Sequence, residues 1–163
     1  MIQIIDYKAG NLTSVKRALD HLEIPSRFVT HGDELAEAER IIFPGVGHAA
    51  SAMAVLHERG FDRGLEQAFA AGIPIMGICL GSQIVLAHSD EGDTPCLGLI
   101  PGNCPRFALS DPALKIPHMG WNQVTITQPH PILRTLEPGD EVDFVHAYYP
   151  QPAGPQHVYA TCE

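Results

Sequence analysis

Basic residues are scarce in this chain of 163 residues, which has 10 lysines and arginines, 19 aspartates and glutamates, and a formal net charge of −9. That charge repels nucleic-acid phosphates and anionic membranes, so it argues against a nucleic-acid-binding function. Long apolar runs are also missing, because glycine and proline interrupt the longest one, residues 68–81, which is shorter than the roughly 20 residues that span a bilayer. The N-terminus lacks the features of a secretory signal, and we therefore expect a cytoplasmic protein.

Cysteine is sparse as well, with four residues, Cys79, Cys96, Cys104 and Cys162. None lies in a CxxC pair or at a zinc-site spacing from histidine, so we expect no disulfide scaffold, no metal and no cofactor. Hydrophobic residues make up 45% of a sequence that has no internal repeat or low-complexity tract, which is enough for one core. We expect a single domain over residues 1–163.

Short apolar runs alternate with segments of helical spacing over the first half of the chain. The runs predict strands at residues 2–6, 27–29, 41–43 and 73–76, and the spacing predicts helices at 12–22, 33–39, 48–56, 61–71 and 82–88. This alternation predicts right-handed βαβ crossovers and a parallel sheet with helices on both faces. The expected fold is an α/β three-layer sandwich of the flavodoxin-like kind.

Prolines become frequent after residue 92, and the later apolar runs are strand-like with few helices between them. Residues 124–127, 142–145 and 158–161 predict antiparallel strands added beside the parallel sheet. Functional residues are expected at the carboxyl ends of the parallel strands, where open α/β sheets form their crevices. Residues 6–11, 44–48 and 77–81 occupy that edge.

The run Gly77-Ile78-Cys79-Leu80-Gly81 has the form of a strand-to-helix elbow that carries a nucleophile, with cysteine at the nucleophile position. Glycine on either side tolerates the strained turn that exposes such a side chain. A thiol at a helix N-terminus lies beside unpaired N–H groups, which favour the nucleophilic thiolate. The alternative is that Cys79 is a small buried hydrophobic residue, as many free cysteines are.

A second glycine turn, Pro44-Gly45-Val46-Gly47, also follows a predicted strand and precedes a predicted helix. With Ala50 it satisfies a dinucleotide-binding fingerprint, but that motif belongs in the first βαβ unit with an acidic residue near the end of the next strand. Here Glu66 lies inside a predicted helix. The turn could instead present backbone N–H groups to an oxyanion beside Cys79, or be a tight turn without chemistry.

A cysteine nucleophile requires a base, and none of the nine histidines is marked as one by its neighbours. His88 is predicted on the same helix as the elbow, roughly 13 Å along its axis, which is out of reach. His118 and His146 lie near predicted strand ends and could approach the site. We do not assign the base to either.

The chain resembles the glutaminase subunits of imidazole glycerol phosphate synthase, within the class I (triad) glutamine amidotransferases. The segments that carry the resemblance occur in the family's order and spacing over the whole chain: residues 4–12 with Ser14-Val15, Pro44-Gly45-Val46-Gly47 with Ala52-Met53, residues 77–83, Pro117-His118-Met119-Gly120-Trp121-Asn122, and Phe144-Val145-His146-Ala147-Tyr148-Tyr149. The elbow identifies the amidotransferase class, and the N-terminal and Pro117–Asn122 segments indicate this particular subunit.

The resemblance implies that Cys79 attacks the side-chain amide of glutamine and forms a thioester, which water hydrolyses to glutamate. It implies an oxyanion site at Gly45, Val46 and Leu80, and substrate binding by Gly47, Gln83, Ala147 and Tyr148. It also implies transfer of the ammonia to a separate (β/α)8-barrel cyclase subunit, which Asn11, Met119 and Trp121 would face.

Four features depart from the family pattern. Lys8 stands where the family often has glycine, Ser82 where methionine is common, and Ala147 where serine is usual. The family's His-Pro-Glu segment, which supplies the base and its orienting carboxylate, has no counterpart, and no His-x-Glu occurs in the chain. We therefore expect a truncated C-terminal part and little sustained activity. The alternatives are a non-catalytic domain that retains the fold and, less favoured, a dinucleotide-binding protein.

Overall fold

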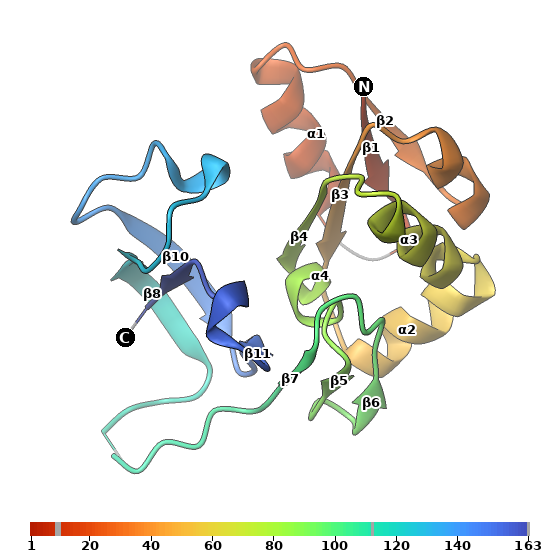
Figure 1. The fold of residues 1–163 in the computed structure, drawn as a ribbon. Helices are drawn as coiled ribbons and strands as arrows, with labels where there is room; N and C mark the ends of the chain where they lie inside the picture. The colour runs from red at the N-terminus through yellow and green to blue at the C-terminus, as the bar shows by residue number, and fades with distance from the viewer. Residues whose placement is uncertain (9–10, 112, 163) are drawn as a thin grey trace.

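The computed structural model describes residues 1–8, 11–111 and 113–162, and Figure 1 shows their arrangement. In the first part of the chain the elements are β1 (Ile2–Ile5), α1 (Leu12–His21), β2 (Ser26–Val29), the 3-10 helix η1 (Gly32–Glu37), β3 (Arg40–Gly45), α2 (Ala49–Glu58), α3 (Phe61–Ala70), β4 (Ile75–Cys79) and α4 (Leu80–Gln83). The second part contains β5 (His88–Ser89), β6 (Thr94–Pro95), β7 (Gly102–Cys104), β8 (His118–Gln123), β9 (Thr125–Ile126), η2 (Pro131–Leu133), β10 (Glu141–His146), β11 (Gln151–Pro152), η3 (Pro155–His157) and β12 (Ala160–Thr161).

The first part is a parallel sheet in the order β2-β1-β3-β4. All three strand pairs run parallel, as the alternation of strands and helices predicts. Burial of β1 and β3 follows from their near-continuous apolar sequence, which is typical of central strands covered on both faces. The central strands therefore provide a rigid base for the loops at their carboxyl ends.

Helices cover both faces of this sheet, which confirms the predicted three-layer α/β sandwich. On one face α1 packs Leu19 against Ile4 and Ile42. On the other face the larger cluster brings α2 and α3 onto the sheet through residues such as Leu56 and Leu65. In Figure 1, α1 lies on the opposite side of the sheet from α2 and α3.

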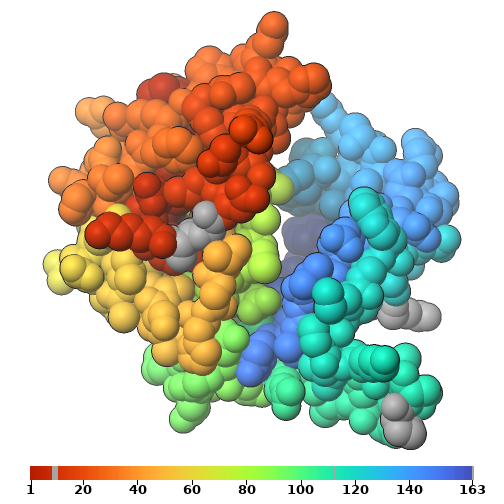
Figure 2. Space-filling model, turned by 180° about the vertical axis from the view of Figure 1, so that it is seen from behind, coloured from red at the N-terminus to blue at the C-terminus, as the bar shows by residue number. Residues whose placement is uncertain are grey.

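The strands predicted in the second part pair antiparallel, as expected, but they form sheets of their own and, among the described residues, do not hydrogen-bond to the parallel sheet. β8 pairs antiparallel with β10, β12 pairs with β9, and β11, β7, β5 and β6 form a separate small sheet. The proline-rich connection between β7 and β8 carries the chain away from β4 before the next long strand begins, and Figure 1 shows the β8–β10 pair well apart from the main sheet. Figure 2 shows the resulting hollow between the two parts of the molecule.

The helix predicted at residues 82–88 is wrong beyond Gln83. α4 ends at Gln83, and His88 lies in β5, which pairs with β6 and β7. Backbone hydrogen bonds explain the early end, because the Ala87 N–H donates to the Gly102 carbonyl instead of continuing the helix. The helix predicted at 33–39 is the shorter 3-10 helix η1.

Within the described ranges, no helix combines the length and the apolar character that a membrane crossing requires.

Candidate functional site

The site is built where three neighbouring strands of the parallel sheet end. β1, β3 and β4 lie side by side, and the register pairs Gly45 at the end of β3 with Cys79 at the end of β4. The two glycine-containing turns that the sequence singled out are therefore adjacent. This confirms the expected clustering of residues 44–48 and 77–81 at one edge of the sheet.

Cys79 occupies a strained backbone conformation at the junction of β4 and α4. Its φ is 55° and its ψ is −120°, a region that glycine adopts readily and that other residues adopt at a cost of roughly 1–3 kcal/mol. The side chain is exposed. Ser82 stabilises the turn, because its hydroxyl donates a hydrogen bond of 2.7 Å to the Cys79 carbonyl oxygen. A strained residue held with its thiol outward is typical of a nucleophile elbow.

Close packing of the elbow against β3 explains the glycine at position 81. A Cβ added there would overlap the carbonyl oxygen of Phe43, and one added at Gly77 would lie 2.7 Å from the carbonyl oxygen of Gly81. Both neighbours are backbone atoms that cannot move independently. The glycines therefore bring the elbow close enough to β3 for Cys79 to face the Gly45 turn.

A cavity of about 220 Å³ opens beside the Cys79 thiol. Its walls come from both parts of the chain. They include most of the candidate residues, namely Val46, Gly47, Cys79, Leu80, Gln83, Ala147 and Tyr148, together with Glu91, Val145 and His146. Gln83 is only 8% exposed although its side chain is polar. Gly45 is not in the wall but is the direct partner of Cys79 in the sheet.

Glu91 is the residue that reasoning from the sequence missed. It is the one carboxylate in the cavity wall, and its Oε2 accepts a 2.7 Å hydrogen bond from the Ala49 N–H at the start of α2. No sequence signal marks it, because it lies in a short acidic run whose members look equivalent. Only the fold of the turn distinguishes Glu91 from its neighbours.

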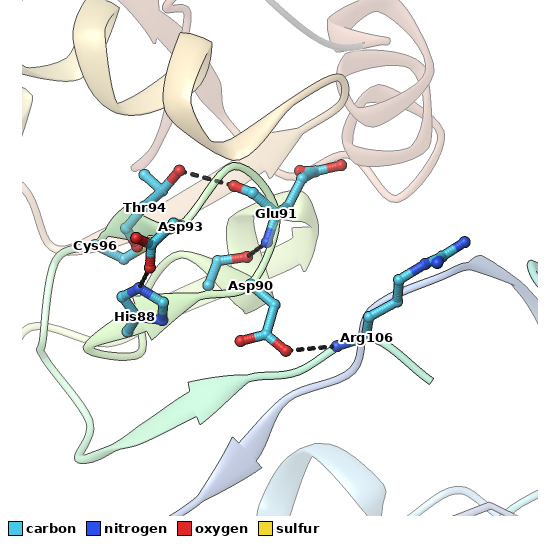
Figure 3. Close-up of polar contacts among 8 residues, drawn as sticks. His88, Asp90, Glu91, Asp93, Thr94, Cys96 and Arg106 are labelled. Carbon is cyan, nitrogen blue, oxygen red and sulfur yellow. Dashed lines mark hydrogen bonds and ion pairs between the residues drawn. The ribbon is translucent and has the colours of Figure 1, made fainter. Parts of the chain in front are cut away.

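The turn that carries Glu91 is stabilised by a set of hydrogen bonds, drawn in Figure 3. Thr94 Oγ1 donates to the Glu91 carbonyl oxygen at 2.7 Å, and the Glu91 N–H donates to Ser89 Oγ at 3.2 Å. At the ends of the turn, His88 Nε2 lies 2.9 Å from Asp93 Oδ1, and the Arg106 N–H donates to Asp90 Oδ2 at 3.2 Å. These contacts fix the backbone of Glu91 and so direct its carboxylate to α2 and the cavity.

Cys96 and Cys104 differ from Cys79 in their surroundings. Burial raises the pKa of the Cys96 thiol to about 11 and that of the buried Cys104 thiol to about 12. Both are therefore protonated and unreactive near neutral pH. Within the described residues, no group of three or more histidine, cysteine or acidic side chains could hold a metal ion.

The histidines do not supply an evident base. His88 pairs with Asp93 on the far side of the Glu91 turn, outside the cavity wall. His146 lines the cavity, but its ring packs against Phe107 and Phe144 at centroid distances of 5.1 and 5.6 Å. Its Nδ1 donates to the Tyr148 carbonyl oxygen at 2.7 Å. His118 stacks on Phe144 and does not line the cavity.

The predicted partner residues fall on two different elements. Met119 and Trp121 lie on one face of β8, where they are 66% and 67% exposed, and the register places Met119 opposite Val145 of β10. Val145 is 57% exposed and also lines the Cys79 cavity. Asn11 instead begins α1, where its side chain accepts a hydrogen bond of 3.2 Å from the Ser14 N–H.

The structure places two of the residues that depart from the family pattern, Lys8 and Ala147. Lys8 has a φ of 66°, in the left-handed region that favours glycine, so lysine is strained at this position. Its N–H donates to Asp6 Oδ1 at 2.9 Å, which holds the turn. Ala147 lines the cavity while its carbonyl oxygen accepts from the Phe107 N–H at 3.0 Å.

Comparison with known proteins gives one consistent result. A family model described as glutamine amidotransferase class-I matches residues 3–163. The imidazole glycerol phosphate synthase subunit HisH of Nitratidesulfovibrio vulgaris (strain DP4) is 47% identical over 99% of this chain and 78% of its own length. The HisH subunit of Trichormus variabilis is 43% identical over 99% of this chain and 76% of its own length. A crystal structure of a glutamine amidotransferase shares the fold, with a TM-score of 0.75 at 18% identity over 98% of this chain and 78% of that one.

Proposed function

The chain belongs to the class I glutamine amidotransferases and, within them, to the HisH subunits of imidazole glycerol phosphate synthase, and we propose that Cys79 is its glutaminase nucleophile. It is a glutaminase subunit of histidine biosynthesis. The observation that carries the assignment of Cys79 is its strained, exposed elbow at the mouth of a cavity that also contains Gln83. The alternative of a dinucleotide-binding protein is not supported. Glu66 lies in the middle of α3, whereas that motif requires an acidic residue near the end of the next strand.

The reaction follows from the chemistry of a thiolate and an amide. The Cys79 sulfur bonds to the side-chain carbonyl carbon of glutamine, and the carbonyl oxygen takes up the electron pair as an oxyanion. When the carbonyl re-forms, the carbon–nitrogen bond breaks and the nitrogen takes a proton and leaves as ammonia. Water then adds to the thioester, the carbon–sulfur bond breaks, and glutamate and the thiol are released.

The oxyanion would be stabilised by backbone N–H groups on both turns beside the thiol. Leu80 follows the nucleophile and lines the cavity, so its N–H belongs to the elbow itself. Gly45 and Val46 approach from β3, opposite Cys79. Removal of one such donor typically costs about 2.7–4 kcal/mol of barrier stabilisation.

The remaining cavity residues would bind the two ends of glutamine. Glu91 carries the negative charge that a substrate ammonium group requires, and its hydrogen bond to the Ala49 N–H keeps one carboxylate oxygen fixed. Gln83 and the backbone of Gly47, Ala147 and Tyr148 supply neutral polar groups on the other walls. These residues would orient the substrate amide toward the sulfur.

We expect ammonia release from glutamine to be slow, because the two histidine–carboxylate pairs formed by the described residues, His57–Asp62 and His88–Asp93, lie outside the cavity. When a catalytic triad is incomplete, oxyanion stabilisation and substrate binding alone still accelerate the reaction roughly 10³–10⁴-fold over the uncatalysed rate. The test is an ammonia assay with the barrel cyclase subunit present, with asparagine in place of glutamine as the control. Equal rates with the two amides would favour a non-catalytic domain.

The partner proposed for this subunit is a (β/α)8-barrel cyclase, and its docking surface would include Met119, Trp121 and Asn11. The support is the exposed apolar face of β8 next to Val145, which also borders the cavity. Contiguous apolar surface of this kind is typical of protein interfaces.

Trp121→Ala is expected to weaken binding to the barrel subunit at least tenfold, because exposed tryptophans at interfaces are frequent hot spots. Isothermal titration calorimetry with the purified barrel subunit measures the effect. Leu22→Ala, which removes a side chain of similar exposure at the end of α1, is the control and should leave affinity unchanged. Equal affinities for both variants would remove the β8 face from the interface.

A further inference from the structure

His146 lies at the end of β10, and its imidazole is a polar group of the Cys79 cavity that the reaction described above does not use. The ring sits in an aromatic cluster, with its centroid 5.1 Å from that of Phe107 and 5.4 Å from that of His118. Its Nδ1 donates to the Tyr148 carbonyl oxygen at 2.7 Å, while Nε2 is buried without a hydrogen-bond partner among the described residues. The polar contact of the ring is therefore with its own backbone, two residues further along.

Two more hydrogen bonds tie the backbone after His146 to an earlier segment of the chain. The Phe107 N–H donates to the Ala147 carbonyl oxygen at 3.0 Å. The Tyr149 N–H donates to the Pro105 carbonyl oxygen at 3.1 Å. Because the imidazole binds the carbonyl of that same peptide group, the peptide group is fixed at both its N–H and its oxygen. Three contacts thus set the conformation of residues 147 and 148.

The Tyr148 N–H is the group that this arrangement leaves available, because no hydrogen bond among the described residues uses it. It shares a planar trans peptide with the Ala147 carbonyl, and the N–H and C=O of such a peptide point in opposite directions. Since that carbonyl is directed at Phe107, the N–H is directed away from Phe107, and both residues of the peptide line the Cys79 cavity. A donor in this wall suits the carboxylate of a substrate whose ammonium group would pair with Glu91.

We propose that His146 is a positioning residue, whose Nδ1–H holds the Tyr148 carbonyl and thereby directs the Tyr148 N–H at the substrate carboxylate. The inference rests on the proposed glutaminase function and adds a residue that controls substrate affinity. Without the ring, residues 147 and 148 lose one of their three restraints, and a rotated N–H loses the nearly linear geometry of a good hydrogen bond. The ring acts through the backbone, so its loss should affect binding and leave the reactivity of the sulfur unchanged.

His146→Leu removes the donor and keeps an apolar side chain in the aromatic cluster. For a chloroketone analogue of glutamine, we expect the concentration that gives half the maximal labelling rate of Cys79 to rise about five- to tenfold. The maximal rate itself should stay within about twofold of wild type, because the reacting groups are retained. Intact-protein mass spectrometry over a concentration series measures both quantities, and circular dichroism verifies the fold.

Two further reagents separate positioning from other roles of the ring. Iodoacetamide has no carboxylate, so its rate at Cys79 should be equal in wild type and His146→Leu, whereas loss of a general base would slow it. The carboxamide of the chloroketone analogue carries a neutral group in place of the carboxylate. His146→Leu should weaken binding of this compound by less than about twofold, since the charge-assisted hydrogen bond is already absent.

His146→Asn and His146→Gln test the position of the donor. The asparagine nitrogen can take the place of Nδ1 and donate to the same carbonyl, whereas the longer glutamine side chain places its nitrogen nearer to Nε2. His146→Asn should therefore restore the affinity for the analogue, and His146→Gln should not. His118→Leu is the matched control, because it removes an imidazole from the same cluster that does not line the cavity. It should leave the affinity unchanged.

An unchanged affinity in His146→Leu overturns the proposal, as does an equal loss in His118→Leu or an equal slowing of iodoacetamide. If the analogue labels Cys79 of the wild type no faster than chloroacetone, which lacks the amino-acid part, the proposed function itself fails, and the two failures are thereby distinguished. Nitrogen-15 NMR of the wild type is independent of any variant and should find a hydrogen on His146 Nδ1. A hydrogen on Nε2 alone would overturn the proposal even if the variants did not fold.

Discussion

Cys79→Ala is expected to abolish covalent capture of a chloroketone analogue of glutamine, with a fall of at least about a thousandfold in the labelling rate. In the proposed site three features act on this one sulfur: its exposure at the elbow, the backbone donors expected on both turns, and a cavity that would bind the rest of the analogue. Alanine retains the backbone and removes only the nucleophile. Peptide mapping after a timed reaction at pH 8 measures the loss.

Cys96→Ala is the matched control and should leave labelling unchanged. At pH 8 a thiol whose pKa is about 11 is ionised to roughly one part in a thousand, and Cys104, with a pKa of about 12, is ionised about ten times less. Neither can compete with an exposed thiol at the elbow. Label found mainly on Cys96 or Cys104 would contradict the assignment of the nucleophile.

Gly81→Ala is expected to lower the free energy of unfolding by about 3 kcal/mol or more. The added methyl group would overlap the carbonyl oxygen of Phe43, so either the elbow or β3 must shift, and overpacking of this kind typically costs 1–3 kcal/mol and occasionally more. Because the overlapped carbonyl group of Phe43 belongs to the backbone, no side-chain rotation can relieve the overlap. Urea denaturation followed by circular dichroism gives the change.

Gly154→Ala separates this effect from the general cost of replacing a glycine. A methyl group at position 154 would meet only the end of the Gln156 side chain, which can rotate away. We expect less than about 1 kcal/mol for that variant. A similar loss in both variants would show that the approach of the elbow to β3 is not the cause.

The same geometry changes the expectation for the oxyanion turn. From the sequence, Gly45→Pro is expected to harm turnover more than folding, because a turn at a strand end tolerates the loss of one N–H. The structure adds a packing effect, since a Cβ at Gly45 would lie 2.7 Å from both the Gly81 nitrogen and the Tyr7 hydroxyl oxygen. Substitutions there disturb packing as well as chemistry, which makes Gly45 a poor position for isolating the oxyanion contribution.

The parallel sheet, its flanking helices and the elbow could be predicted from the sequence because each has a local signal. Apolar runs of three to five residues alternate with helical spacing, and Asn11 marks the start of α1 by capping it. The clustering at the sheet edge follows from the rule that parallel strands end together. These signals depend on residues close in sequence.

The wrong and missing predictions depend on contacts between distant residues. The segment after Gln83 has helical spacing, but hydrogen bonds such as Ala87 to Gly102 replace the helix with short strands. Glu91 differs from neighbouring acidic residues only because the turn directs it to α2 and the cavity. The pairing of β8 with β10 away from the main sheet likewise depends on where the proline-rich connection carries the chain.

Because Cys79 has a positive φ, the residue that would best stabilise the fold at this position differs from the residue that the reaction requires. Glycine is the residue that this conformation suits best, so selection for a more stable protein would favour glycine at position 79, and selection for glutaminase activity would eliminate it. Engineering campaigns that rank variants by melting temperature alone would therefore select against the proposed nucleophile. Position 79 should be held fixed in any stabilised library of this domain.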